Sequence, residues 1–382
     1  MNSFKLNPLE IPEIISLVGD FLPRSDLPNC LRISKTFYSA LVNLVWNALE
    51  KHKEAIEELV VSSDLECYES LRGCDRLKHI FIYDITTDEV DPFFQLCKRL
   101  RYLDMQYTTL TRLPLNFLDN DEDTFIFPNL SILSFVRVKI PHCLGMWTAR
   151  CPGLRSLKVL NKDNPIDDFY RTAFLNHPYK PKAISDLCLP DVRIEDEDMA
   201  AILRQLTQLR QLKVPGYNFG VLSLRELLAD EQEILENGHV LRIKRVQRLC
   251  DIIEVLKLRL GDMKADGGGQ AILANCPRLR ILCGVRIKVS EVVGGSEWVS
   301  TGLTKLQVDF GVGVDKESAE GLEKQRIVFK QLGRLTRLRK LNLTYSRHGK
   351  PQTFDLRLRT NLDELANLRS LRFLSLNGEA QW

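Results

Sequence analysis

Residues 151–159 read CPGLRSLKV, and they contain the pattern that decides the fold of this chain. Leu154 is followed three positions later by Leu157 and two positions after that by Val159. The last two apolar residues are two apart, so they point to one face of a short strand while their neighbours point to the other face. The spacing therefore predicts a strand with one buried face and one exposed face.

The same spacing, named here the repeat phrase, recurs along the chain. Eleven copies are Leu77-Ile80-Ile82, Leu100-Leu103-Met105, Leu130-Leu133-Phe135, Leu154-Leu157-Val159, Ile184-Leu187-Leu189, Leu209-Leu212-Val214, Ile253-Leu256-Leu258, Leu279-Leu282-Gly284, Leu303-Leu306-Val308, Leu338-Leu341-Leu343 and Leu371-Leu374-Leu376. From Leu77 to Leu371 the steps average about 29 residues, at the upper end of the range of leucine-rich repeats. Only the eighth copy is degenerate, because Gly284 replaces its third apolar residue.

Stretches of helical period precede most copies, for example AAILRQLTQL before Leu209 and QAILANCPRL before Leu279. Each unit is therefore expected to be a helix and a strand, and stacked units place parallel strands on a concave side and helices on a convex side. We predict an α/β solenoid of about eleven degenerate leucine-rich repeats over residues 74–382. The charged, helix-period sequence near residues 223–250 predicts a protruding helical insertion.

Composition limits the classes of partner. The 53 Lys and Arg residues nearly balance the 50 Asp and Glu residues, giving a formal net charge of +3. Nucleic-acid binding needs a larger basic excess, so we expect a protein partner. Charged residues interrupt every hydrophobic segment, which excludes a membrane helix, and the start MNSFKLNPLE does not resemble an export signal. We expect a cytoplasmic or nuclear protein with reduced cysteines.

The cysteines follow the repeat instead of a metal-binding pattern. Cys74, Cys97, Cys151 and Cys276 each stand three residues before a lead leucine, where a small apolar side chain suits a crowded turn. The sequence contains no C-x-x-C pair and no histidines at zinc-finger spacing from a cysteine pair. We expect no metal, no cofactor and no catalytic residue.

Residues 8–46 lack the repeat phrase and form a unit of their own. Pro12 opens a helical pattern, Pro23 ends it, and two further short helices are expected after Asp26 and around Phe37. A unit this small is expected to keep apolar surface for a partner. We assign residues 1–50 to this module and residues 51–73 to a helical linker.

This module resembles the F-box. Ile11-Pro12-Glu13-Ile14-Ile15 is similar to its opening Leu-Pro-x-Glu, Asp26-Leu27 to its middle, Ile33-Ser34-Lys35 to its Val-Ser-Lys, and Leu44-Val45-Trp46 to its closing Leu-Trp. Phe37 stands where many members carry tryptophan, and one residue is missing after Pro12. The order of box and repeats is similar to that of F-box proteins with leucine-rich repeats, of the fungal type.

The resemblance implies a substrate receptor of a Skp-cullin-F-box ubiquitin ligase, which binds a Skp-type adaptor and through it a cullin. Carried over by position, the adaptor face would be Ile11, Pro12, Ile14, Ile15, Leu22, Leu27, Ile33 and Phe37. The alternative is that these residues form the interior of a small helical cap. Two other functions stay open: an interaction scaffold with a vestigial box, and a regulator of small GTPases.

The unknown substrate protein is expected on the concave face, formed by residues beside the buried positions. The first repeats place aromatic and hydrogen-bonding residues there, a composition favoured at the centre of interfaces: His79, Phe81, Tyr83, Tyr102, Asp104 and Gln106. Later repeats place a basic line there, which suits an acidic or phosphorylated segment: Lys158, Lys213, Lys257, Arg259 and Lys340. The alternative for this line is that it serves only solubility.

Overall fold

The structure is a computed structural model. It describes residues 11–22, 36, 55–62, 74–87, 90–114, 117, 125–140, 144–160, 169–176, 183–236, 239–245, 247–259, 263–311, 318–343 and 360–376. These residues are the described part of the chain. Of the N-terminal module it includes one helix, α1 (Pro12–Phe21), which Pro12 begins at its first position.

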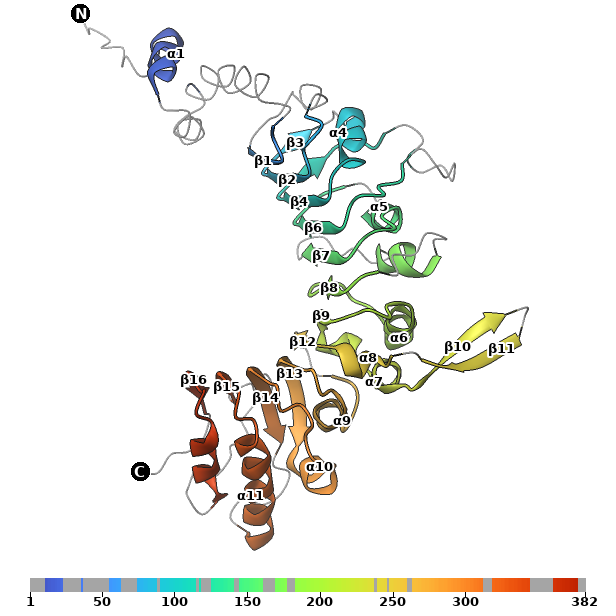
Figure 1. Ribbon diagram of the computed structural model, residues 1–382, viewed down its shortest axis with the longest axis vertical. Coiled ribbons are helices and arrows are strands. Elements are labelled where there is room, and N and C mark those ends of the chain that lie inside the picture. Colours follow the sequence, from blue (N-terminus) through green and yellow to red (C-terminus); the bar gives the residue numbers. More distant parts are fainter. Residues whose placement is uncertain are drawn as a thin grey trace, which may run out of the picture.

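Twelve strands of the described part form one parallel sheet (Figure 1). Each new strand adds beside the preceding one in chain order, as expected for stacked units. The strands are β1 (Glu58–Ser62), β2 (His79–Tyr83), β4 (Tyr102–Gln106), β6 (Ile132–Val136), β7 (Ser156–Leu160), β8 (Asp186–Cys188), β9 (Gln211–Pro215), β12 (Val255–Arg259), β13 (Ile281–Lys288), β14 (Lys305–Gly311), β15 (Lys340–Asn342) and β16 (Phe373–Ser375). Two short strands, β3 (Thr86–Thr87) and β5 (Thr109–Leu110), pair beside the first of these units.

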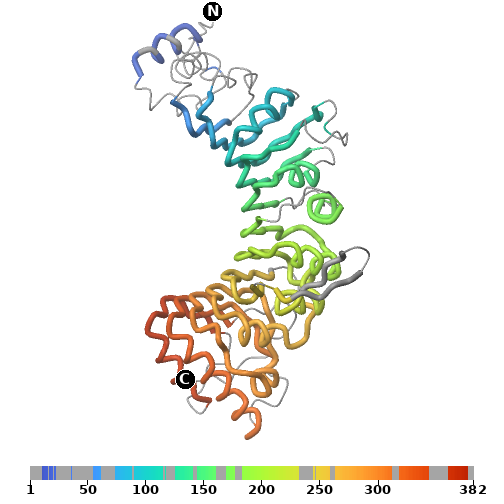
Figure 2. Tube along the Cα trace, turned by 45° about the vertical axis from the view of Figure 1, so that its right-hand side comes forward, coloured from blue at the N-terminus to red at the C-terminus, as the bar shows by residue number. Residues whose placement is uncertain are grey.

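Helices cover one face of the sheet and leave the other face free, so that the strands line the inner side of a curved array (Figures 1 and 2). They are α4 (Val90–Cys97), α5 (Leu144–Ala149), the π-helical turn η3 (Arg171–Asn176), α6 (Asp196–Gln205), the 3₁₀ turn η4 (Gly216–Asn218), α7 (Val221–Leu228), α8 (Leu249–Ile252), α9 (Gly268–Asn275), α10 (Val289–Gly294), α11 (Ala319–Gly333) and the 3₁₀ helix η6 (Leu362–Asn367). The predicted solenoid of strands and helices is confirmed.

The repeat phrase forms the core between sheet and helices. In the first ten copies all three positions are buried, whereas Leu374 in the last copy is 45% exposed. No described strand lies beyond β16, so this final unit has a neighbour on one side only. In the degenerate copy, Gly284 has φ 82° and lies in an irregularity of β13, after which Val285 and Ile287 resume the buried alternation. Glycine is required there because other residues disfavour positive φ.

The helical linker predicted for residues 51–73 is wrong at its centre. Residues 58–62 form β1, which pairs in parallel with β2. Ile56, Leu59 and Val61 repeat the spacing of the phrase, and all three pack on the core. The array therefore begins one unit earlier than the eleven copies indicated.

The insertion predicted as helical near residues 223–250 is helical only in part. Its first part is α7, but β10 (Glu231–Glu236) and β11 (His239–Lys244) then form an antiparallel hairpin before the short α8. The hairpin projects from the helical side of the array (Figure 1). Its residues Glu-Gln-Glu-Ile-Leu-Glu have a helical composition, and pairing with the second strand overrides that preference.

The four cysteines before lead leucines are buried, as the phrase predicts. Burial raises the pKa values of the Cys97, Cys151 and Cys276 thiols, so these side chains are protonated near neutral pH. They act as small apolar groups in the core and not as nucleophiles.

Candidate functional site: the free face of the sheet

Strand register aligns the outward-facing side chains into rows across the sheet. One row runs Glu58, His79, Tyr102, Ile132, Ser156, Asp186 and Gln211. The next row runs Val60, Phe81, Asp104, Ser134, Lys158, Cys188, Lys213 and Lys257. Neighbouring members are about 4.8 Å apart because this is the spacing of paired strands. The residues predicted for the concave face from β2 to β12 therefore lie side by side.

At the N-terminal end five rings form the aromatic patch: His79, Phe81, Tyr83, Tyr102 and Tyr107. The Tyr102 ring lies 4.8 Å from the Phe81 ring and 5.9 Å from the His79 ring, centre to centre. Tyr83 and Tyr107 meet edge to face at 5.5 Å. Such pairs stabilise by about 0.5–1.5 kcal/mol beyond the burial of their surface. They hold the exposed ring faces in fixed positions.

Tyr107 belongs to a ladder of tight turns at the ends of three strands. Asp84, Tyr107 and Arg137 directly follow β2, β4 and β6, and each has a φ between 52° and 55°. Backbone hydrogen bonds link them, with Asp84 N donating to Gln106 O at 2.9 Å and Tyr107 N to Val136 O at 2.8 Å. The Arg137 guanidinium lies 5.4 Å from the centre of the Tyr107 ring. The ladder fixes where Tyr107 projects.

Asp104 lies beneath this patch and is only 8% exposed. Tyr102 Oη and Gln106 Nε2 donate to its Oδ2, at 3.4 and 3.2 Å. Its Oδ1 is buried without a hydrogen-bond donor in the described part. Burial, and then the charge of Asp104, raise the pKa of Tyr102, so this phenol stays protonated and can donate.

The centre of the face has a different chemistry. Lys158, Lys213 and Lys257 form the lysine row, with Cys188 between the first two. Lys158 and Lys213 form no ion pair with a described carboxylate. Burial raises the pKa of the Cys188 thiol although all three lysines act in the opposite direction. The centre is therefore a cationic surface around a protonated thiol.

The predicted basic line does not continue in this row beyond β12. Cys283, Gln307 and Asn342 occupy the next positions, whereas Lys305 and Lys340 pair with each other in the neighbouring row. Lys340 Nζ stands 4.2 Å from the centre of the Phe373 ring. Arg259 ends β12 opposite Pro215, and its side chain lies outside the described residues.

Helix α1 carries the described part of the predicted adaptor face. Ile11, Pro12, Ile14 and Leu22 are at least partly exposed, whereas Ile15 is fully buried. Ile14, Leu17, Val18 and Phe21 form one exposed stripe at helical spacing, here the α1 stripe. Leu17 is 60% exposed and Phe21 is 83% exposed, and neither was predicted. Leu27, Ile33 and Phe37 lie outside the described residues.

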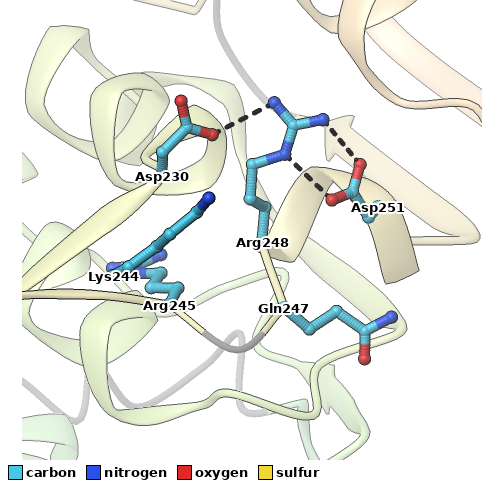
Figure 3. Close-up of a pocket in the computed structure, with 6 residues that line it drawn as sticks. All are labelled: Asp230, Lys244, Arg245, Gln247, Arg248 and Asp251. Carbon is cyan, nitrogen blue, oxygen red and sulfur yellow. Dashed lines mark hydrogen bonds and ion pairs between the residues drawn. The ribbon is translucent and has the colours of Figure 1, made fainter.

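One pocket of about 560 Å³ lies at the base of the hairpin, lined by Asp230, Lys244, Arg245, Gln247, Arg248 and Asp251 (Figure 3). Arg248 bridges two of its acids, with Nη2 2.8 Å from Asp251 Oδ1 and Nη1 3.2 Å from Asp230 Oδ1. The buried Arg245 donates to the Glu226 carboxylate on α7 at 2.6 Å. Because most of these charges pair with one another, the pocket serves to fasten the hairpin to the array.

The described part holds no group of three or more His, Cys, Asp or Glu residues placed to bind a metal ion. None of its helices combines the length and apolar character needed to cross a bilayer.

No protein-family model matches the chain, and its sequence matches no curated protein. Among solved structures it is similar to a leucine-rich-repeat protein of Leptospira interrogans, at 14% identity and a TM-score of 0.43, over 86% of this chain and 68% of that one. It is also similar to human 5T4, the trophoblast glycoprotein, at 15% identity and a TM-score of 0.35, over 71% of this chain and 89% of that one. The phrase and the parallel sheet decide the fold class. The fold is a leucine-rich-repeat solenoid.

Sequence reasoning missed several members of the leucine-rich-repeat face. Glu58 and Val60 belong to the unrecognised first strand, and Tyr107 follows a strand instead of lying within it. The spacing Ile56-x-x-Leu59-x-Val61 was the available signal for the first two. Tyr107 had no such signal, because its position depends on the turn ladder.

Proposed function

We propose that this chain is the substrate-recognition subunit of a Skp-cullin-F-box type ubiquitin ligase. In this proposal the N-terminal module binds the Skp-type adaptor, and the leucine-rich repeats bind a target protein by their free sheet face. The chain itself performs no catalysis.

The exposed α1 stripe is the main observation that supports binding of the adaptor by the N-terminal module. Its four apolar side chains lie on one face of a helix and remain exposed, although burying them would be favourable by about 25 cal/mol per Å². An exposed apolar stripe of this kind fits a protein partner. The resemblance of Ile11 to Ile15 and of Asp26-Leu27 to the F-box is the reason for proposing the Skp-type adaptor as that partner.

The shape and composition of the repeats support binding of a target protein by their free sheet face. Parallel strands present a continuous face on which rows from many units act together. Exposed aromatic side chains at one end and lysines at the centre are suited to a protein chain. Burial raises the pKa of the Cys188 thiol on this face, which makes it a weak nucleophile near neutral pH.

The test is a pull-down of the full-length chain with a purified Skp-type adaptor. The double variant Leu17→Asp and Phe21→Asp should lower affinity by more than about tenfold, since two large apolar contacts are replaced by charges. Val221→Asp is the matched control, because this side chain is 62% exposed on α7, which belongs to the repeats. Adaptor binding that survives in the double variant, or is absent from the wild-type chain, would reject the ligase role.

A further inference from the structure

We propose that the aromatic patch and Asp104 form a binding site for an arginine side chain of the target protein. This inference rests on the proposed use of the free face for a protein target, and it adds the chemical class that this end of the face recognises.

The carboxylate of Asp104 is buried beside the aromatic patch. A charge removed from water is costly unless an opposite charge or hydrogen bonds compensate it. Asp104 has two neutral donors on Oδ2 and none on Oδ1, and it takes part in no ion pair of the described chain. Ser134, its neighbour in the same row, also has a buried hydroxyl oxygen without a described partner. A cation arriving at this position would supply the missing compensation.

Mostly aromatic and apolar side chains lie beside Asp104 on the free face. The neighbouring positions on the free face of β1, β2 and β4 carry Glu58, Val60, His79, Phe81 and Tyr102. None of them is Lys or Arg, and Glu58 adds a second, exposed carboxylate. The rings of Phe81 and Tyr102 lie at 43° to each other, so they present faces in two directions. Aromatic faces attract cations through their quadrupole.

An arginine side chain fits this position better than a lysine side chain does. A planar guanidinium can stack on a ring and still donate hydrogen bonds to a carboxylate in its plane, whereas an ammonium group is compact and more strongly hydrated. The structure already places one guanidinium over a ring at the edge of the patch, where Arg137 lies 5.4 Å from the centre of the Tyr107 ring. The lysine row begins at Lys158, two strands beyond Asp104, and repels a cation bound further along the face.

The experiment titrates the full-length chain with N-acetyl-arginine methylamide and with its citrulline counterpart, which is nearly isosteric but uncharged, and follows binding by NMR. Variants are Asp104→Asn, which keeps the side-chain shape, and Phe81→Leu. The matched control is Asp186→Asn, which removes one negative charge from the same face at β8. N-acetyl-lysine methylamide tests the choice of arginine.

The wild-type chain should bind the arginine probe more tightly than the citrulline and lysine probes, by about tenfold or more. Asp104→Asn should weaken binding of the arginine probe by a similar factor. Asp186→Asn should leave this affinity unchanged. Asp104→Asn should unfold at the same temperature as the wild type or higher, because a neutral amide needs no counter-charge. Equal binding of arginine and citrulline, or an equal loss in both Asp variants, would overturn the proposal. That result would leave adaptor binding by α1 untouched, so the two proposals fail separately.

Discussion

Two regions of the solenoid differ in the composition of both their core and their free sheet face. In the N-terminal region, β2 to β6 with α4 and α5, the core is a cluster of rings that includes Phe94, Phe127 and Trp147, and the free face carries the aromatic patch. In the central region, β7 to β12 with η3, α6 and α7, the described core is mainly aliphatic, with Phe169, Tyr170, Phe174 and Phe219 as its rings, and the free face carries the lysine row. A repeat fold thus keeps one backbone while its two faces change composition from unit to unit.

The difference predicts two modes of recognition. Fixed rings around a buried carboxylate favour short-range contacts with a defined side chain, which determine how long a complex lasts. Partly exposed lysines with flexible stems attract a partner over longer distances and speed its association, and this attraction weakens with salt. The N-terminal region is therefore expected to select the target, and the central region to attract it.

The largest expected effect tests whether the two cores are separate. Trp147 packs against several rings, with centres 4.5 Å from Phe94 and 5.5 Å from Phe135. Trp147→Ala should lower the free energy of unfolding by about 3–5 kcal/mol, as is usual for loss of a buried ring. Hydrogen exchange should show the loss in β4 and β6, since each unit contacts only its neighbours.

Leu256→Ala is the matched change in the central core, expected to cost about 2–5 kcal/mol and to open β9 and β12. If both variants opened the same strands, the array would unfold as a single unit and the division into two cores would be wrong.

A smaller effect tests how the central helices are joined. The Asp196 carboxylate on α6 accepts from Gly220 N at 2.9 Å, Leu222 N at 2.9 Å and Ser223 N at 3.0 Å, and so caps the first turn of α7. Asp196→Ala should cost about 1–2 kcal/mol, the range for lost caps. Gly220 leaves room for this carboxylate, which a side chain there would strike.

The same cap predicts a dependence on pH. Burial acts to raise the pKa of Asp196, but the hydrogen bonds from Ser223, Leu222 and Gly220 outweigh it and lower the pKa below its usual value. The cap therefore stabilises fully above the unfolded pKa of about 3.9 and is lost as the pH falls through the lower folded value. The stability gap between wild type and Asp196→Asn, measured by urea unfolding, should shrink in acid. A stability difference that does not change with pH would show that the shape of the Asp196 side chain, and not its charge, stabilises the cap.

The smallest effect per residue concerns the lysine row. Replacing Lys158, Lys213 and Lys257 by Ser should weaken binding of a heptaglutamate probe by about tenfold, because each partly exposed ion pair contributes up to about 1 kcal/mol. The dependence of affinity on salt should fall with it. The control replaces three exposed lysines elsewhere, Lys139, Lys264 and Lys330, and keeps the same net charge. Equal weakening in both triple variants would show that the lysine row acts only through the net charge of the protein.

Much of this fold could be predicted because one spacing repeats. The phrase located the strands of the twelve-stranded sheet from β2 onward and, by the period of two, the side of the sheet on which each residue lies. The hairpin was missed because local helical preference lost to strand pairing, and β1 was missed because its phrase stands at the edge of the array. Neither Asp104's burial nor its lack of a counter-charge follows from spacing, since both depend on rings from neighbouring strands.

The most direct measurement is selection of binders from a random peptide-display library by three forms of the full-length chain: wild type, Asp104→Asn, and the triple lysine variant. The wild type should select peptides that combine arginine with acidic residues. Asp104→Asn should keep the acidic preference and lose arginine, while the triple variant should keep arginine and lose the acidic preference. The same sequence preference from all three forms would contradict a free face with two chemically distinct recognition regions.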